Sequence, residues 1–155
     1  MTYFYGHKTG TYRGFSNFYQ TSFKDDEGNE YNCSEQYFMA KKAKKFKDEK
    51  TYKKIMKETE PTKIKKLGRE VKNFDQKKWD KWRYNIMFNA CMYKFTQNKK
   101  LMKLLKSTEG VIAEASPRDT TWGIGIGVKR AESGDKWRGK NLLGKILMEI
   151  RDSEE

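Results

Sequence analysis

SEQYFMAKK, residues 34–42, decides the fold, because the hydrophobic period of the chain changes there from strand-like to helical. Ser34 is a common helix-capping residue, and Glu35 suits the positive first turn of a helix. Glu35 and Lys42 stand seven residues apart, so they return to one face of that helix, about 10 Å apart along its axis. Phe38 lies on the same face, so an acid and an amine are predicted to stand beside apolar side chains.

Charges inside an apolar stripe call for an explanation, because a helix that faces solvent normally puts its charges on the opposite side. The pair is therefore either a buried ion pair or part of a pocket. A plainer interpretation exists for each residue. Glu35 would only interact with the helix dipole, and Lys42 would be solvated like the other lysines that crowd this helix.

The rest of the chain predicts an α+β fold that is predominantly helical, a compact single domain over residues 1–155 with a few short N-terminal strands. Residues 1–33 are rich in Tyr, Phe and Gly and predict two or three short strands, with a turn at residues 25–29. Residues 111–113 predict one more brief buried strand. Helical patterns cover residues 34–47, 50–58, 61–68, 75–95, about 101–105 and 141–151.

Three residues are predicted to mark helix ends. Pro61 suits the first turn of a helix, and Gly68 can adopt the left-handed conformation that ends one. Asn141 is a candidate cap for the last helix, in which Leu143 and Ile150 are expected to point inward.

Charge composition favours partners that carry phosphate. Lys and Arg number 34 against 21 Asp and Glu, which gives a net charge of +13 and a positive field around the protein. Nucleic acid and phosphorylated metabolites both fit such a field. The alternative is that lysine-rich faces merely keep the helices soluble.

Other features argue against several classes of protein. Cys33 and Cys91 are too few for a disulfide scaffold, and His7 is the single histidine, so no metal site and no cofactor is expected. The N-terminus lacks a secretory signal, and no apolar stretch approaches the ~18 residues that span a membrane. We expect a soluble, cytoplasmic protein that is a monomer and does not bind membranes.

Three stretches combine polar with aromatic residues outside a simple amphipathic pattern: residues 15–18, 35–42 and 114–123. If they converge, their carboxylates can donate or accept protons at a glycosidic bond. Desolvation would lower the pKa of Lys42, so that its amine could attack a sugar carbon and form a Schiff base. The plainer alternatives are that Asp119 is only a turn residue and Trp122 only a core residue.

Residues 123–127, Gly-Ile-Gly-Ile-Gly, are a weak phosphate-loop signal. They lack the terminal Gly-Lys-Ser/Thr of a P-loop and the context of a dinucleotide site. Such glycines more often permit a turn or close backbone packing, although their amides could still contact a phosphate.

From Phe15 to Arg151 the chain resembles the NADAR superfamily, the YbiA-like proteins. The matching residues follow one another in the order and spacing of that family: Phe15-Ser16-Asn17-Phe18, Ser34-Glu35-Gln36-Tyr37-Phe38, Ala40, Lys42, Gly68-Arg69, Trp79, Met87, Ala90, Lys94, Phe95, Glu114, Asp119, Trp122-Gly123, Gly139, Asn141, Leu143-Gly144, Leu147-Met148-Glu149 and Arg151.

This resemblance implies an N-glycosidase that acts at C1 of a phosphorylated ribose. It implies that Glu35 and Asp119 act as acid, base or oxocarbenium-stabilising groups, and that Lys42 is a Schiff-base nucleophile toward the opened ribose. The remaining residues assigned to substrate binding are Ser16, Asn17, Trp122 and Gly123 for the sugar, base or phosphate, and Arg13 and Arg69 for phosphate. Because Lys41 adjoins Lys42, the choice of nucleophile depends on the alignment register.

Two substrate classes are associated with this family: ribosylated pyrimidine intermediates of riboflavin synthesis, and ADP-ribose attached to guanine in nucleic acid. The charge of +13 favours the second, because many cations can neutralise backbone phosphates and release counterions. We therefore expect removal of ADP-ribose from guanine in DNA. Hydrolysis of the riboflavin intermediates and a noncatalytic module that binds ADP-ribose or nucleic acid remain the alternatives.

Overall fold

The computed structural model describes residues 1–153. Contacts divide the chain into two units, one formed by residues 20–97 and the other by residues 1–19 together with residue 98 onward. Each unit is described by itself below. The expected single domain over residues 1–155 stays a prediction, and residues 154 and 155 lie outside the described part.

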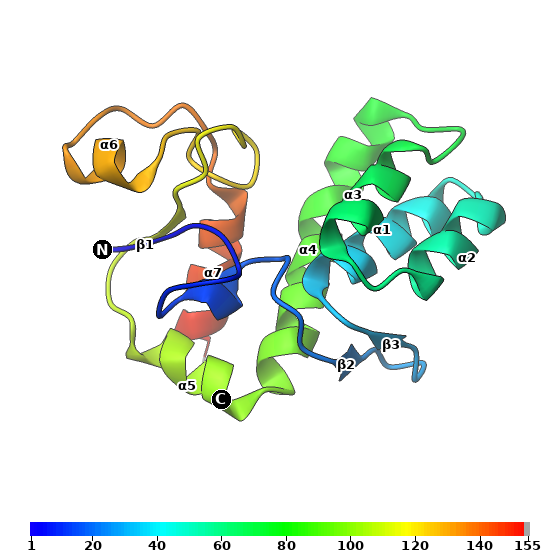
Figure 1. Cartoon of the computed structure of the whole chain (residues 1–155), viewed down its shortest axis with the longest axis horizontal. Helices are drawn as coiled ribbons and strands as arrows, with labels where there is room; N and C mark the ends of the chain where they lie inside the picture. The colour runs from blue at the N-terminus through cyan, green and yellow to red at the C-terminus, as the bar shows by residue number, and fades with distance from the viewer. Residues whose placement is uncertain (154–155) are drawn as a thin grey trace. The chain divides into compact units, whose positions relative to one another are not determined.

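The unit of residues 20–97 combines a small hairpin with four helices. Strands β2 (Phe23–Lys24) and β3 (Glu30–Tyr31) pair antiparallel. Helix α1 (Ser34–Lys45) packs against all three other helices, α2 (Glu49–Lys57), α3 (Pro61–Arg69) and α4 (Gln76–Thr96), as Figure 1 shows. Central placement explains why eight of its residues are buried, including the charged Glu35.

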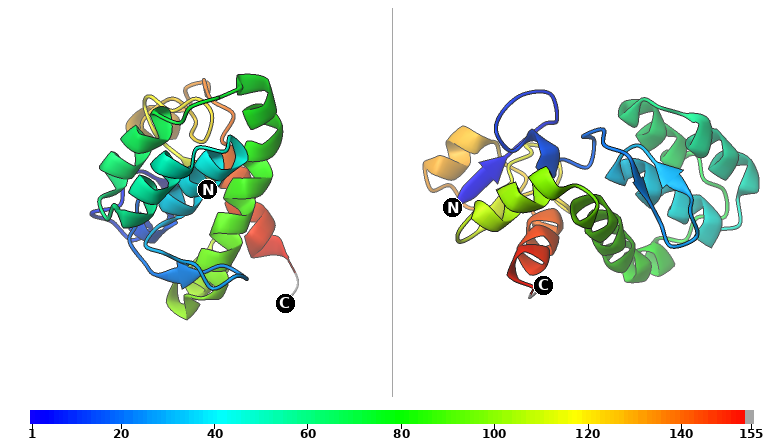
Figure 2. Two further views of the ribbon diagram at one scale, coloured as in Figure 1. Left: turned by 90° about the vertical axis from the view of Figure 1, so that its right-hand side faces the viewer. Right: turned by 90° about the horizontal axis from the view of Figure 1, so that it is seen from below.

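In the other unit, a parallel strand pair connects the N-terminal segment of the chain to the segment that follows α5 (Lys99–Ser107). Strand β1 (Thr2–Phe4) lies beside β4 (Ile112–Glu114), and α7 (Leu142–Asp152) packs against β4 and against α5. Figure 2 shows the chain from two further sides, with β1 in blue and α7 in red. A 3₁₀ turn, η1 (Arg13–Phe15), and the short helix α6 (Val128–Glu132) complete it.

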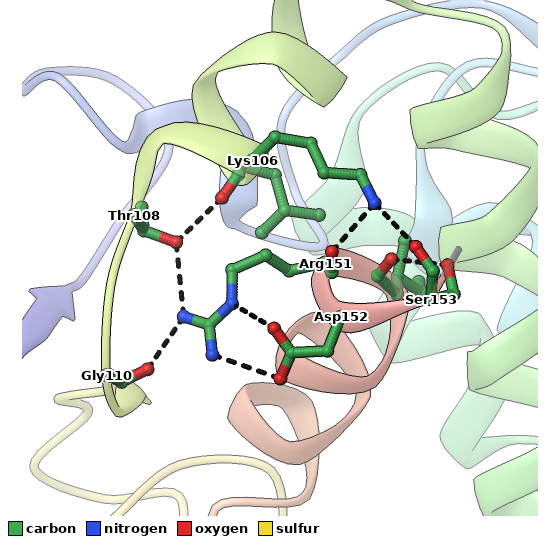
Figure 3. A network of polar contacts seen from close by, with 8 residues as sticks. Lys106, Thr108, Gly110, Arg151, Asp152 and Ser153 are labelled. Atoms are coloured by element: carbon green, nitrogen blue, oxygen red, sulfur yellow. Dashed lines mark hydrogen bonds and ion pairs between the residues drawn. The ribbon is translucent and has the colours of Figure 1, made fainter. Parts of the chain in front are cut away.

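Arg151 connects the end of α7 to the segment that follows α5 through hydrogen bonds. Its guanidinium donates a 2.7 Å hydrogen bond to the carbonyl of Gly110 and another, at 3.4 Å, to the Thr108 hydroxyl. The Lys106 ammonium donates in turn to the carbonyls of Arg151 and Ser153, at 2.7 and 2.9 Å, as Figure 3 shows. These bonds satisfy carbonyls that a helix C-terminus leaves open.

Most of the predicted elements are confirmed. The three strands within residues 1–33, the helices within 34–47, 50–58, 61–68 and 75–95, and the last helix all exist within one or two residues of the expected bounds. The Asp25 carboxylate makes the expected turn by accepting the backbone N–H of Glu27 and of Asn29. Leu143 and Ile150 are buried as predicted.

The predicted helix ends were wrong in two places. Cys33 rather than Ser34 is the N-cap of α1, and Ser34 is already helical. Gly68 lies inside α3 without a positive φ; a Cβ there would stand 1.8 Å from the Met39 sulfur, so close helix packing is the reason for glycine. Asn141 is the N-cap residue of α7, as predicted, but its side chain makes no capping hydrogen bond. Its amide instead accepts from Glu114 N–H at 3.1 Å and donates to the carbonyl of Ile112 at 2.9 Å, which holds β4.

Candidate active site

Helix α1 presents Glu35 from its first turn and Lys42 from its last. The neighbouring Gln36 fixes the start of this helix, because its amide donates to the carbonyl of Ile55 at 3.0 Å and accepts the Asn32 N–H at 2.8 Å. A buried side chain with both its donor and its acceptor engaged holds one rotamer. Glu35 is therefore carried on backbone that is anchored to the end of α2.

Lys42 lies half-buried among aromatic rings. Its ammonium nitrogen is 4.5 Å from the centroid of the Phe74 ring and 5.8 Å from that of Trp79. Burial is the largest influence on this group and lowers its pKa from the ordinary 10.5; the positive charge of Arg69 lowers the pKa further, while the negative charge of Glu35 opposes the shift. More of this amine is therefore uncharged near neutral pH than of a solvated lysine.

The adjacent Lys41 has a different environment. Its ammonium nitrogen stands 5.3 Å from the centroid of Tyr37, whereas that of Lys42 lies beside Phe74 and Trp79. The choice of Lys42 over Lys41 as the nucleophile stays a prediction.

Lys94 is a buried cation outside the set of predicted site residues. It lies on α4 and is 1% exposed, which is rare for lysine. Its charge and that of Glu35 both act on the buried thiol of Cys33: burial raises the pKa of Cys33 to about 11, the charge of Glu35 raises it as well, and the charge of Lys94 lowers it. Lys94 follows Ala90 on the apolar face of α4, so the argument that singled out Lys42 would have found it too.

Arg69 is the exposed last residue of α3. Its charge acts on Lys42, as does the charge of Glu35, so two of the predicted site residues influence a third within the unit of residues 20–97. Arg69 is the only exposed residue of these three, so its guanidinium can contact a phosphate group of a ligand.

Ser16 and Asn17 follow η1 in the other unit and are both buried. The Ser16 hydroxyl accepts the backbone N–H of Phe18 at 3.1 Å. The side-chain oxygen of Asn17 is buried and, among residues 1–153, has no hydrogen-bond partner. A buried acceptor left unpaired is costly, so this oxygen suits a donor on a ligand such as a ribose hydroxyl. Arg13 is exposed and donates to the carbonyl of Gly10 at 3.2 Å.

Asp119 is held in a tight turn. One oxygen of its carboxylate accepts the backbone N–H of Thr121 at 2.9 Å and of Trp122 at 2.8 Å. The interpretation of Asp119 as a turn residue is therefore correct, and a catalytic role for it stays a prediction. Trp122 is half-buried, and its role in substrate binding stays a prediction.

Gly123 has a structural reason to be glycine. A Cβ there would stand 2.9 Å from the carbonyl oxygen of Glu114 and 3.0 Å from that of Asp119. Ile124 and Ile126 are buried in a small apolar cluster. Residues 123–127 thus serve close backbone packing, and a phosphate contact at Gly123 stays a prediction.

The structure therefore assigns the predicted site residues to two sets. Glu35, Lys42 and Arg69 belong to residues 20–97, and the other six, Arg13, Ser16, Asn17, Asp119, Trp122 and Gly123, belong to the second unit. The convergence of the three polar and aromatic stretches stays a prediction.

Three further observations bear on the kind of site. Residues 1–153 contain no group of three or more His, Cys, Asp or Glu side chains that could hold a metal ion. Cys33 and Cys91 are both buried, and neither is in a disulfide. No helix in this part of the chain is long and apolar enough to cross a membrane.

Comparison with known proteins yields one family. A model of the NADAR domain matches residues 3–153. N-glycosidase R617 of Acanthamoeba polyphaga mimivirus is 45% identical over 148 residues, which cover 91% of the chain and 87% of that protein. N-glycosidase YbiA of Escherichia coli is 33% identical over 91% of the chain and 81% of its own length.

Two more matches concern structure and a longer protein. The NMR structure of the E. coli protein YbiA covers 97% of this chain and 83% of its own, with a TM-score of 0.78 and 31% identity. The riboflavin biosynthesis protein PYRR of Zea mays is 35% identical over 74 residues, which cover 47% of the chain but only 10% of the maize protein. The similarity to YbiA thus extends over both units, whereas the similarity to PYRR is partial.

Proposed function

Because the chain belongs to the NADAR family, we propose that it is an N-glycosidase that hydrolyses the bond between a base nitrogen and C1 of a phosphorylated ribose. The names of the mimivirus and E. coli relatives support this class of activity. Within the molecule, the supporting observation is a half-buried amine, Lys42, whose pKa is lowered by burial and by the charge of Arg69, against the opposing charge of the buried Glu35.

The proposed reaction begins with attack of the uncharged Lys42 amine on C1. The bond between C1 and the base nitrogen breaks, and the departing nitrogen takes a proton from a carboxylic acid, for which Glu35 is the candidate. Ring opening converts the lysine adduct to a Schiff base. Water then adds to C1 and the amine leaves, so that the net change is addition of one water across the glycosidic bond, giving ADP-ribose and the unmodified base.

We propose guanine in DNA that carries ADP-ribose as the substrate. The net charge of +13 supports a polyanionic substrate. The lysines of α1 also support it, because Lys41, Lys44 and Lys45 each place an ammonium group within 5.3 Å of an aromatic ring centroid. Cations next to aromatic rings are the combination that single-stranded nucleic acid uses for backbone and base contacts.

A second candidate is hydrolysis of ribosylated pyrimidine intermediates of riboflavin synthesis. The observation that favours it is the similarity over 74 residues to a maize protein named for riboflavin biosynthesis. A small metabolite requires only a local basic site, so under this alternative the charge of the remaining surface has no role in catalysis. A module that binds ADP-ribose or nucleic acid without turnover is the third candidate.

One experiment separates the three. The protein is incubated with an ADP-ribosylated DNA oligonucleotide and, separately, with the riboflavin-pathway intermediates, and the products are identified by mass spectrometry. We expect release of ADP-ribose and of the unmodified strand, with turnover that falls as salt is raised. Release of ribose phosphate from the small metabolites alone would refute the DNA substrate, and binding without any product would refute the enzyme.

A further inference from the structure

Phe74 is an exposed aromatic side chain beside the proposed nucleophile. Three large hydrophobic residues within residues 1–153 are exposed, Met1, Tyr5 and Phe74. The first two belong to the N-terminal segment, whereas Phe74 lies in the connection between α3 and α4 and is 40% exposed. Single exposed apolar residues are common on proteins, so its surroundings decide whether this one has a use.

The ring of Phe74 is fixed in place. It meets the ring of Phe46 edge-on, with centroids 5.3 Å apart and planes at 62°. The preceding Asn73 adopts a left-handed conformation, with φ 64°, and its side-chain amide donates to the carbonyl of Phe46 at 3.4 Å. A non-glycine residue in that region costs free energy. The left-handed turn at Asn73 determines the direction in which the Phe74 side chain leaves the backbone.

Phe74 also ends a connected series of aromatic rings. Phe46 lies 5.7 Å from Trp82 and 6.3 Å from Trp79, centroid to centroid. Trp79 and Phe46 are buried. The exposed ring of Phe74 therefore packs against the buried aromatic side chain of Phe46. A planar ring that stacked on it would meet a surface that does not have to reorganise.

Cations surround this surface. The Lys42 nitrogen is 4.5 Å from the Phe74 centroid, and the Lys45 nitrogen is 4.8 Å from the Trp82 centroid. Arg69 is close enough to lower the pKa of Lys42. An occupant that combines a flat ring with a phosphate satisfies both the aromatic and the positive parts of this region, and a nucleotide is that combination.

We propose that Phe74 is a stacking subsite for the purine base that leaves the ribose. The inference rests on the proposed function, since it requires Lys42 to attack C1. At the moment of attack the amine lies about 3 Å from C1, and the base is bonded to that same carbon. A ring 4.5 Å from the amine therefore lies within reach of the departing base.

The matched variants for this subsite are Phe74→Leu, which removes the aromatic face but keeps an apolar side chain, and Phe74→Trp, which keeps the face. We expect Phe74→Leu to raise KM for ADP-ribosylated DNA about tenfold with a smaller effect on kcat, and Phe74→Trp to retain the wild-type KM. Tyr5→Leu, which removes another exposed aromatic residue, is the control and should leave both constants unchanged. Equal kinetics of Phe74→Leu and the wild type would overturn the subsite.

Two small probes separate this inference from the proposed function. Guanosine monophosphate carries base and phosphate, whereas ribose 5-phosphate carries only the latter, and binding of each is measured by calorimetry. We expect Phe74→Leu to weaken guanosine monophosphate about tenfold and to leave ribose 5-phosphate unchanged. Equal weakening of both would overturn the subsite. Loss restricted to guanosine monophosphate, in a wild-type protein that releases no ADP-ribose from DNA, would refute the proposed function and support the subsite.

Discussion

Helix α1 and the loop of residues 115–123 hold the two predicted carboxylates in different ways. Glu35 sits on a regular helix and is 7% exposed, and its charge acts on Lys42 and, like that of Lys94, on Cys33. Asp119 sits in an irregular turn, and one of its oxygens accepts two backbone N–H groups. The same functional group is thus surrounded by side-chain charges in one region and bonded to backbone in the other.

Because of this difference, a catalytic role of each carboxylate can be distinguished from a structural role. An amide can replace a carboxylate that accepts backbone N–H groups, because its oxygen still accepts. It cannot replace a carboxylate that must release a proton to a leaving group or balance a charge. Substitution of acid by amide is therefore informative in both regions, but the two regions should respond with different combinations of turnover and stability.

The largest effect is expected for Glu35→Gln. The variant keeps the shape of the side chain and loses the proton donor, so turnover on ADP-ribosylated DNA should fall about 10,000-fold. Glu132→Gln, at an exposed position of α6, is the control and should remain fully active. Thermal unfolding verifies that both variants fold, and normal turnover of a folded Glu35→Gln would remove Glu35 from the chemistry.

The next largest effect concerns the two adjacent lysines. Lys42→Ala should reduce turnover about 1,000-fold, while Lys41→Ala, whose side chain lies over Tyr37, should stay within about threefold of the wild type. Borohydride reduction during turnover should fix the sugar on Lys42, as peptide mass mapping would show. A reduced adduct on Lys41, or full activity of Lys42→Ala, would contradict the assigned register.

A smaller effect is expected for Asp119, and here two substitutions are needed. Asp119→Ala leaves the N–H groups of Thr121 and Trp122 without their acceptor, so the free energy of unfolding should fall by about 2 kcal/mol. Asp119→Asn keeps an acceptor and should unfold like the wild type. We expect turnover of Asp119→Asn to fall about 100-fold because its acidic group is lost. Wild-type turnover of this variant would show that Asp119 acts only in the turn.

The contrast between the regions also explains what could be predicted from the sequence. Spacing of seven residues placed Glu35 and Lys42 on one side of α1, because a helix converts spacing directly into direction. No such rule applies to residues 115–123, where side-chain to backbone bonds set the path of the chain. The same applies to Asn141, which stands at the N-cap position of α7 as predicted, but whose side chain bonds β4.

Local sequence patterns also did not predict which residues are buried by packing between helices. Gly68 was predicted to end a helix, whereas a Cβ there would meet the Met39 side chain of α1. Lys94 lies on the apolar face of α4 with 1% exposure, a degree of burial that spacing along the helix did not predict. Packing between helices is not encoded by periodicity within a single helix.

The smallest and most specific effect concerns the pKa of Lys42. Arg69 lowers this pKa and Glu35 raises it, so the two charges can be removed separately with opposite signs. Arg69→Gln should raise the pKa, and the rising limb of kcat/KM, which follows the uncharged amine, should move to higher pH. Arg69→Lys keeps a positive charge and should leave the limb near its wild-type position.

The opposite sign is tested by Glu35→Gln, in which the opposing negative charge is absent and the pKa of Lys42 should fall further below 10.5. Because this variant has little turnover, the titration is followed instead by the NMR shift of the carbon next to the Lys42 nitrogen. Lys41 in the same spectra serves as the internal reference. If the two variants moved the pKa of Lys42 in the same direction, Glu35 and Arg69 could not both act on it through their charges, and the electrostatic basis for an activated amine on α1 would be wrong.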